Sequence, residues 1–171
     1  LAASTHKDEE NLCLQTHLEI KKKFKDIKTI IAPRHIERVN DVKLICDKFH
    51  LNSVIVNKNQ VMDIKSEVFI INFYGGLNHY FKYAKSIFIG KSTLKKFEKS
   101  GGQNPIDAAR FGCKIYHGPF VYNFVEIYEL FKKNEISKKI EDFYELSSFL
   151  ISDLKEKRKE TKYFKFLDDL G

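Results

Sequence analysis

The stretch from Ser100 to Pro119, SGGQNPIDAARFGCKIYHGP, carries the signals from which the fold can be predicted. Asn104 and Pro105 suit the cap and the first residue of a helix. Gly112 suits the position just after a helix end, and the apolar run that follows predicts a strand over Lys114–His117. The stretch therefore predicts a loop, a short helix and a strand in succession. The helix can simply be well capped, or its loop can hold a ligand.

The same alternation of short apolar runs and helical spacing extends outward in both directions. Further strands are predicted at Lys28–Pro33, Ser53–Val56, Val68–Ile71 and Ser86–Ile89. Helices are predicted from Asp8 or Glu9 to Phe24, from Val42 to Phe49, from Asn78 to Ala84, from Phe124 to Phe131 and from Ile140 to Leu154. Since the strands are continuously apolar, both of their faces should be buried. The sequence thus predicts one α/β domain over residues 1–171, a Rossmann-like parallel sheet flanked by helices.

Composition describes a globular protein and excludes several chemistries. The 171 residues are 43% hydrophobic and 31% charged, and no apolar run approaches the ~18 residues that span a bilayer. Cys13, Cys46 and Cys113 are far apart, which favours buried free thiols in a reducing compartment. No HExxH, EF-hand, Walker, GxGxxG or GxSxG motif occurs, and the histidines are dispersed. We therefore expect no metal and no cofactor.

The net charge of +7 leaves the kind of partner open. It is compatible with nucleic acid, anionic lipid or a small anionic substrate. Lysines are scattered along the predicted helices, however, as a solvated surface would require. Charge alone therefore decides nothing.

Loops at the carboxyl ends of parallel strands are where ligands of such sheets bind. In AASTHKDEE, Asp8 is a plausible N-cap, and Glu9 and Glu10 would favour the helix start electrostatically. Capping alone is the alternative there. In APRHIER, the guanidinium of Arg34 suits a phosphate or carboxylate, with a surface ion pair to Glu37 or Asp41 as the alternative.

Two further loops carry glycine pairs. Gly75 and Gly76 in INFYGGL let the backbone approach a ligand, or form a plain turn. In the fourth loop, the helix that begins near Asn104 offers free N–H groups to an anion or to ligand hydroxyls. Capping does not account for Gly101 and Gly102, which would fit a backbone that passes close to a nucleotide.

These loops together resemble the carboxyl-terminal half of the bacterial 3-deoxy-D-manno-octulosonic acid (Kdo) transferases. That family's pattern is A-S-T-H-E-G-E-E, P-R-H-P-E-R, D-T-x-G-E-L, G-G-H-N-P-L-E-P/A and G-P-x-x-x-N-F. The chain has AASTHKDEE, APRHIER, INFYGGL, SGGQNPIDAARFG and HGPFVYNF in the same order along nearly its whole length. The resemblance implies the carboxyl-terminal half of a GT-B glycosyltransferase fold.

The resemblance also implies a function, which is donor binding for transfer of Kdo from CMP-Kdo to a lipid A precursor in lipopolysaccharide synthesis. It implies the cytoplasmic face of the bacterial inner membrane, no metal, and no nucleic acid partner. Arg34 would meet the nucleotide, and Asp107 would accept hydrogen bonds from the ribose hydroxyls. The implied substrate-binding residues are Pro33, Arg34, Tyr74, Gly75, Gly76, Asn104, Pro105, Ile106 and Asp107, with Ser4, Thr5 and His6 near the transferred sugar.

Several positions depart from the family's pattern. Gly76 stands where the family has Glu, so a side-chain contact is lost. Asp107 replaces a longer Glu, and Lys7 and Asp8 replace Glu and Gly. Weaker or altered donor binding would follow from these changes.

The family's amino-terminal domain binds the lipid acceptor and supplies the glutamate proposed as general base, and neither is recognisable here. We therefore expect no catalytic residue in this chain, which would be an excised domain or one product of a split gene. The alternatives are a degenerate, non-catalytic module that uses a lysine-rich face on anionic lipid or nucleic acid, and a sugar-nucleotide epimerase or other GT-B half that prefers UDP.

Overall fold

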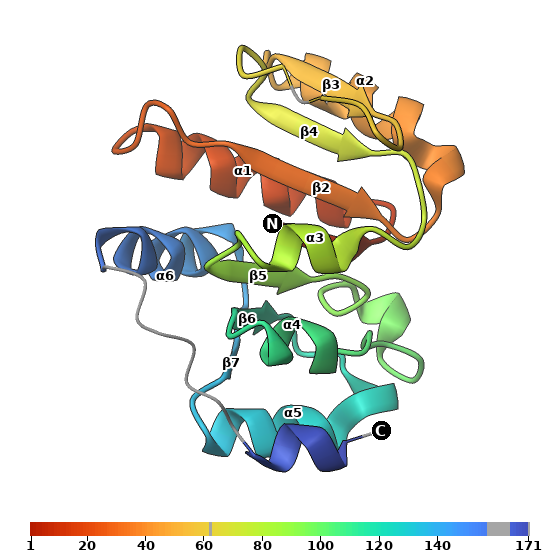
Figure 1. Ribbon diagram of the computed structural model, residues 1–171, viewed down its shortest axis with the longest axis vertical. Coiled ribbons are helices and arrows are strands. Elements are labelled where there is room, and N and C mark those ends of the chain that lie inside the picture. Colours follow the sequence, from red (N-terminus) through yellow and green to blue (C-terminus); the bar gives the residue numbers. More distant parts are fainter. Residues whose placement is uncertain (62, 157–164, 171) are drawn as a thin grey trace.

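The computed structural model describes residues 1–61, 63–156 and 165–170. A seven-stranded parallel sheet has the order β3-β4-β2-β1-β5-β6-β7, which runs from the top of Figure 1 to the bottom. Its strands are β1 (Ala2–Thr5), β2 (Thr29–Pro33), β3 (Ser53–Val56), β4 (Val68–Ile71), β5 (Ser86–Ile89), β6 (Lys114–His117) and β7 (Ser137–Lys139). The α-helices are α1 (Glu9–Lys21), α2 (Val39–Lys48), α3 (Leu77–Phe81), α4 (Ile106–Arg110), α5 (Val125–Lys133) and α6 (Phe143–Lys155). Short 3-10 helices are η1 (Ile36–Arg38), η2 (Lys95–Phe97), η3 (Tyr122–Phe124) and η4 (Lys165–Asp169).

Helices cover both faces of the sheet, as the predicted fold class requires. On one face, α1, α2 and α6 pack in a core that contains Leu14, Val42 and Leu146. On the other face, α4 and α5 pack in a core that contains Ile106 and Phe131. Successive strand residues point into opposite cores, and both sets are buried. The continuous apolar strands predicted from the sequence are thereby confirmed.

Two strands and several helix boundaries differ from the sequence-based expectation. Ala2–Thr5 was expected in a loop but forms the central strand β1, where small side chains fit between two helical layers. Ser137–Lys139 was not predicted, because its two lysines carry no apolar signal; it is the edge strand β7, where exposed lysines are usual. Ile140 precedes α6 instead of lining it, and its N–H donates to the carbonyl of His117.

The strand order reverses at β1, which pairs with β2 on one side and with β5 on the other. Chain segments leave the carboxyl ends of β1 and β5 in opposite directions. In parallel sheets, this arrangement opens a crevice above the strand ends in which ligands bind. The candidate site is therefore expected above β1 and β5.

Candidate functional site

The loops after β1 and β2 meet directly at this edge of the sheet. The Arg34 N–H donates to the Thr5 carbonyl at 2.9 Å. The rings of His6 and His35 lie edge to face, with centroids 5.4 Å apart, and the His6 ring makes a similar contact with Phe97. The structure therefore brings residues of the first and second predicted loops together.

Left-handed backbone conformations are concentrated at the same place. Ser4, Asp8 and Lys91 have φ of 55°, 82° and 57°, although none is glycine. Such conformations cost free energy and persist only where the surroundings enforce them, often at functional sites. The predicted capping role of Asp8 is wrong: its side chain caps nothing and lies 3.5 Å from Lys96.

Glu10 is a fully buried carboxylate rather than a charge at the helix surface. Arg38 binds it through both terminal nitrogens, with Nη1 2.8 Å from Oε1 and Nη2 3.2 Å from Oε2. The Thr5 hydroxyl donates to Oε1 at 3.0 Å. Because Thr5 is 0% exposed and its hydroxyl is engaged here, it supports the loop from beneath and presents no surface to a ligand.

Glu9 is equally buried and binds the loop that follows β5. Sequence reasoning treated Glu9 and Glu10 only as favourable charges at a helix start. A signal was present nonetheless: Glu9 lies four residues before Cys13, which was predicted to be buried, and this spacing places both residues on one helical face.

The side chain of Arg34 is exposed above β2. Among the described residues, its guanidinium makes no ion pair, so the expected alternative of a pair with Glu37 or Asp41 is not observed. Pro33, by contrast, is buried at the end of the strand. A guanidinium held at a strand end without a protein partner is available to an anion.

The third predicted loop follows β4, next to β2 in the sheet. Tyr74 is exposed, and Gly75 has φ of 80°, which favours glycine. A Cβ at Gly76 would overlap the ring of Phe73, which packs partly buried against Ala32 and Val56. The ring of Phe73 thus occupies the space that a side chain at position 76 would need.

The helix in the fourth loop begins one residue later than predicted, with Pro105 and not Asn104 at the N-cap position. Asn104 Oδ1 accepts a hydrogen bond from the Ile106 N–H at 2.9 Å, and Pro105 lies just before the helix, not at its first position. Gly112 ends the helix with φ of 72°. Since the Ile106 N–H is taken and its side chain is buried, the amino end of α4 offers a ligand less than expected.

Asp107 and the glycine pair complete that loop. The Asp107 carboxylate is exposed and lies 3.7 Å from Arg110, a surface pair that a ligand hydroxyl can replace. A Cβ at Gly101 would overlap the carbonyl oxygens of Phe97 and Phe120, and Gly102 has φ of 90°. Packing against the protein's own backbone and a left-handed turn therefore explain this pair without a nucleotide.

His6 lies at the centre of these loops. Burial lowers its pKa to about 4, although Glu9 opposes this, so the imidazole is neutral at pH 7. Its Nε2 is buried and has no hydrogen-bond partner among the described residues. His6 is therefore suited to hydrogen bonding and not to holding a charge.

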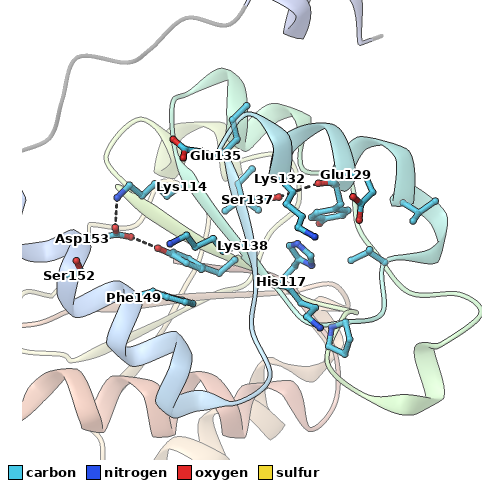
Figure 2. A pocket seen from close by; sticks show the side chains of 18 of the residues that line it. Lys114, His117, Glu129, Lys132, Glu135, Ser137, Lys138, Phe149, Ser152 and Asp153 are labelled. Atoms are coloured by element: carbon cyan, nitrogen blue, oxygen red, sulfur yellow. Dashed lines mark hydrogen bonds and ion pairs between the residues drawn. The ribbon is translucent and has the colours of Figure 1, made fainter.

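A separate hollow of about 980 Å³ is lined by β6 and β7, with α5 on one side and α6 on the other (Figure 2). None of the predicted residues lines it. At its α6 side, Asp153 accepts hydrogen bonds from Lys114 at 2.6 Å and from Tyr116 at 2.7 Å; at its α5 side lies His117, whose pKa burial lowers to about 4. Its lining of mixed charge lies on the open edge of the sheet, so we place the candidate site above β1 and β5 instead.

The described residues contain no cluster able to hold a metal ion and no helix long and apolar enough to cross a membrane. The three cysteines are buried and none forms a disulfide among the described residues, as predicted. The arrangement above β1 and β5 can therefore offer a cation, a carboxylate and neutral hydrogen-bonding groups to a small polar ligand.

Comparison with known proteins shows that the chain is similar in sequence to a group of bacterial transferases. No protein-family model matches it. It is 29% identical over 150 residues to the 3-deoxy-D-manno-octulosonic acid transferase of Rickettsia prowazekii, covering 88% of this chain and 32% of that enzyme. It is 27% identical over 130 residues to the transferase of the same name from Haemophilus influenzae, covering 76% and 30%. The chain therefore spans about a third of the length of these relatives.

Among solved structures, the chain resembles the C-terminal CMP-Kdo binding domain of WaaA from Acinetobacter baumannii. The TM-score is 0.78 at 22% identity, over 90% of this chain and 78% of that domain. This likeness confirms the predicted fold.

Proposed function

Because the chain is related to the 3-deoxy-D-manno-octulosonic acid transferases along about a third of their length, we propose that it is the donor-binding domain of such an enzyme. The observation that carries the proposal is the order of the quoted motifs around one sheet edge, above β1 and β5. The ligand would be CMP-Kdo, and the acceptor a lipid A precursor held by a separate domain at the cytoplasmic face of the inner membrane.

Two exposed side chains would make the principal contacts with the donor. The exposed guanidinium of Arg34 would bind the donor phosphate with paired N–H donors. The carboxylate of Asp107 would accept hydrogen bonds from the ribose hydroxyls after leaving Arg110. Buried Thr5, Pro33, Pro105 and Ile106 would serve as the framework beneath the ligand.

Transfer would need a general base in addition to donor binding. The acceptor hydroxyl would attack the anomeric carbon of Kdo, and CMP would leave with the electron pair of the broken bond. A general base must take the hydroxyl proton at that moment. We propose that the acceptor domain supplies it, and that this chain alone binds donor without catalysing transfer.

Calorimetric titration with CMP tests the proposal. Hydrogen bonds to charged groups contribute about 1.5–3 kcal/mol, so Arg34→Ala should weaken CMP binding by about 10- to 100-fold. Arg34→Lys should bind with intermediate affinity, because it keeps the charge and loses the fork. Asp107→Ala should weaken binding by about tenfold.

The matched control is Lys48→Ala, which removes an exposed cation from the end of α2. It should leave CMP affinity unchanged. Absence of CMP binding by the unmodified chain at millimolar concentration would overturn the proposal. Tighter binding of UDP, or salt-sensitive binding to anionic vesicles or RNA without any response to CMP, would favour the alternative functions instead.

A further inference from the structure

In the part of the chain that the structure describes, the carboxylate of Glu9 is held by neutral donors. It is 0% exposed. Oε1 accepts hydrogen bonds from the N–H of Ser92 at 2.8 Å, the N–H of Thr93 at 3.1 Å and the Thr93 hydroxyl at 3.0 Å. Oε2 accepts from the N–H of Lys91 at 2.6 Å and from that of His6 at 2.9 Å. Among the described residues, no lysine or arginine forms an ion pair with it, so backbone dipoles provide most of its stabilisation.

These N–H groups lie where a parallel sheet commonly binds a ligand, yet here they bind a side chain of the protein itself. Successive N–H groups after a parallel strand, at the point where strand order reverses, are a common binding place for the anionic part of a ligand. Here Glu9 fills that cradle with a carboxylate from α1. A donor phosphate would therefore have to be bound by other groups, such as Arg34.

The loop that Glu9 holds also supports the next two loops along the sheet edge. The Lys91 carbonyl accepts from the Gly102 N–H at 2.8 Å. The Ser92 hydroxyl accepts from the Gly118 N–H at 2.9 Å, and the Ser92 carbonyl accepts from the Phe120 N–H at 2.8 Å. A chain of hydrogen bonds thus leads from Glu9 to the loop that precedes Asn104 and Asp107.

We propose that Glu9 is a positioning residue for the donor site. Its carboxylate takes the place of a ligand anion above β5 and thereby sets the position of residues 91–93, 101–102 and 118–120. Those segments in turn fix where Asp107 meets the ligand. The inference rests on the proposed function, because it states which site the positioning serves.

Glu9→Gln tests this role. Glutamine keeps the size of the side chain but turns an N–H₂ group toward N–H donors, so the loop after β5 must shift. Because the shift is passed on to the loop that carries Asp107, we expect CMP binding to be about tenfold weaker, as for loss of the Asp107 hydrogen bonds themselves. Amide NMR signals of Lys91, Ser92, Gly102 and Gly118 should move, because they report the hydrogen bonds directly.

Asp153→Asn is the matched control. Asp153 is also a buried carboxylate with several donors, which include Ser86 and Lys114. It lies at the amino ends of β5 and β6, at the edge of the sheet away from the candidate site. This variant should lose stability while CMP affinity and the amide signals of Gly102 and Gly118 stay unchanged. If Glu9 had a purely structural role, Glu9→Gln would likewise lower stability and leave CMP affinity unchanged.

A milder variant keeps the test decisive if Glu9→Gln does not fold. Thr93→Val removes one donor to Glu9 and should weaken CMP binding by about threefold, with the same amide signals moving. If the unmodified chain binds CMP and every variant of Glu9 or Thr93 that folds binds CMP as tightly as the unmodified chain, the inference is overturned and the proposed function stands. If the unmodified chain does not bind CMP, the proposed function falls, and the donor-site role of Glu9 with it.

Discussion

Replacing Arg38 by alanine distinguishes two readings of Glu10. If Glu10 only favours the helix start by its charge, its contribution is about 0.3–1 kcal/mol and does not depend on Arg38. The structure indicates otherwise: the side chain of Glu10 is 0% exposed and that of Arg38 is 17% exposed, and two hydrogen bonds join them. Removing one partner of a buried pair leaves the other charge uncompensated, at a cost of about 3–5 kcal/mol.

Urea denaturation followed by circular dichroism measures this cost. Arg38→Ala should lower the free energy of unfolding by about 3–5 kcal/mol without changing the slope of the transition. The melting temperature should fall by about 6–20 °C, since each kcal/mol shifts it by about 2–4 °C in a chain of this size. Lys43→Ala is the control, because its pair with Asp47 on α2 is exposed and should contribute less than about 1 kcal/mol.

A double-mutant cycle completes the test. Combining Glu10→Gln with Arg38→Ala should cost less than the sum of the single changes, by about 2 kcal/mol, because neither variant group is then left as an unpaired buried charge. A loss below about 1 kcal/mol for Arg38→Ala, no larger than that for Lys43→Ala, would refute the buried clamp.

Two further predictions concern His117 and the pair Phe73 and Gly76. Burial holds the pKa of His117 at about 4, below its value of about 6.5 in the unfolded chain, so its contribution to stability is complete above pH 6.5 and is lost as pH falls toward 4. Unfolding in urea at pH 7 and pH 5 should show a loss of roughly 2 kcal/mol from this residue, which His117→Phe removes; an unchanged pH dependence in that variant would contradict the assignment. Gly76→Glu should destabilise the chain by about 1–3 kcal/mol through overlap with Phe73, and adding Phe73→Thr should recover part of that loss; strictly additive melting shifts would show that the two positions do not compete for space.

The elements that could be predicted share one property, which is a strong local signal. Val68–Ile71 is continuously apolar and Ser86–Ile89 is apolar after its first residue, and their sequence positions were predicted without error. The short helix that starts after Asn104 was predicted from its cap and its terminal glycine. Ala2–Thr5 lacked such a signal, because alanines become a strand there only through pairing with β2 and β5.

The candidate site divides in the same way. Sequence alone determined the fold class and the loops that follow the strands, because hydrophobic periodicity and turn residues are local properties. The roles of Arg34 and Asp107 at the ligand stay predictions, and both residues are exposed. Only the tertiary structure decided that Glu9 and Glu10 are buried and that Gly101 packs against protein backbone. Four of the five hydrogen bonds to the Glu9 carboxylate come from residues more than 80 positions further along the chain. A carboxylate loses its water only when the donors that replace it have been brought together by folding, and no local pattern encodes that event.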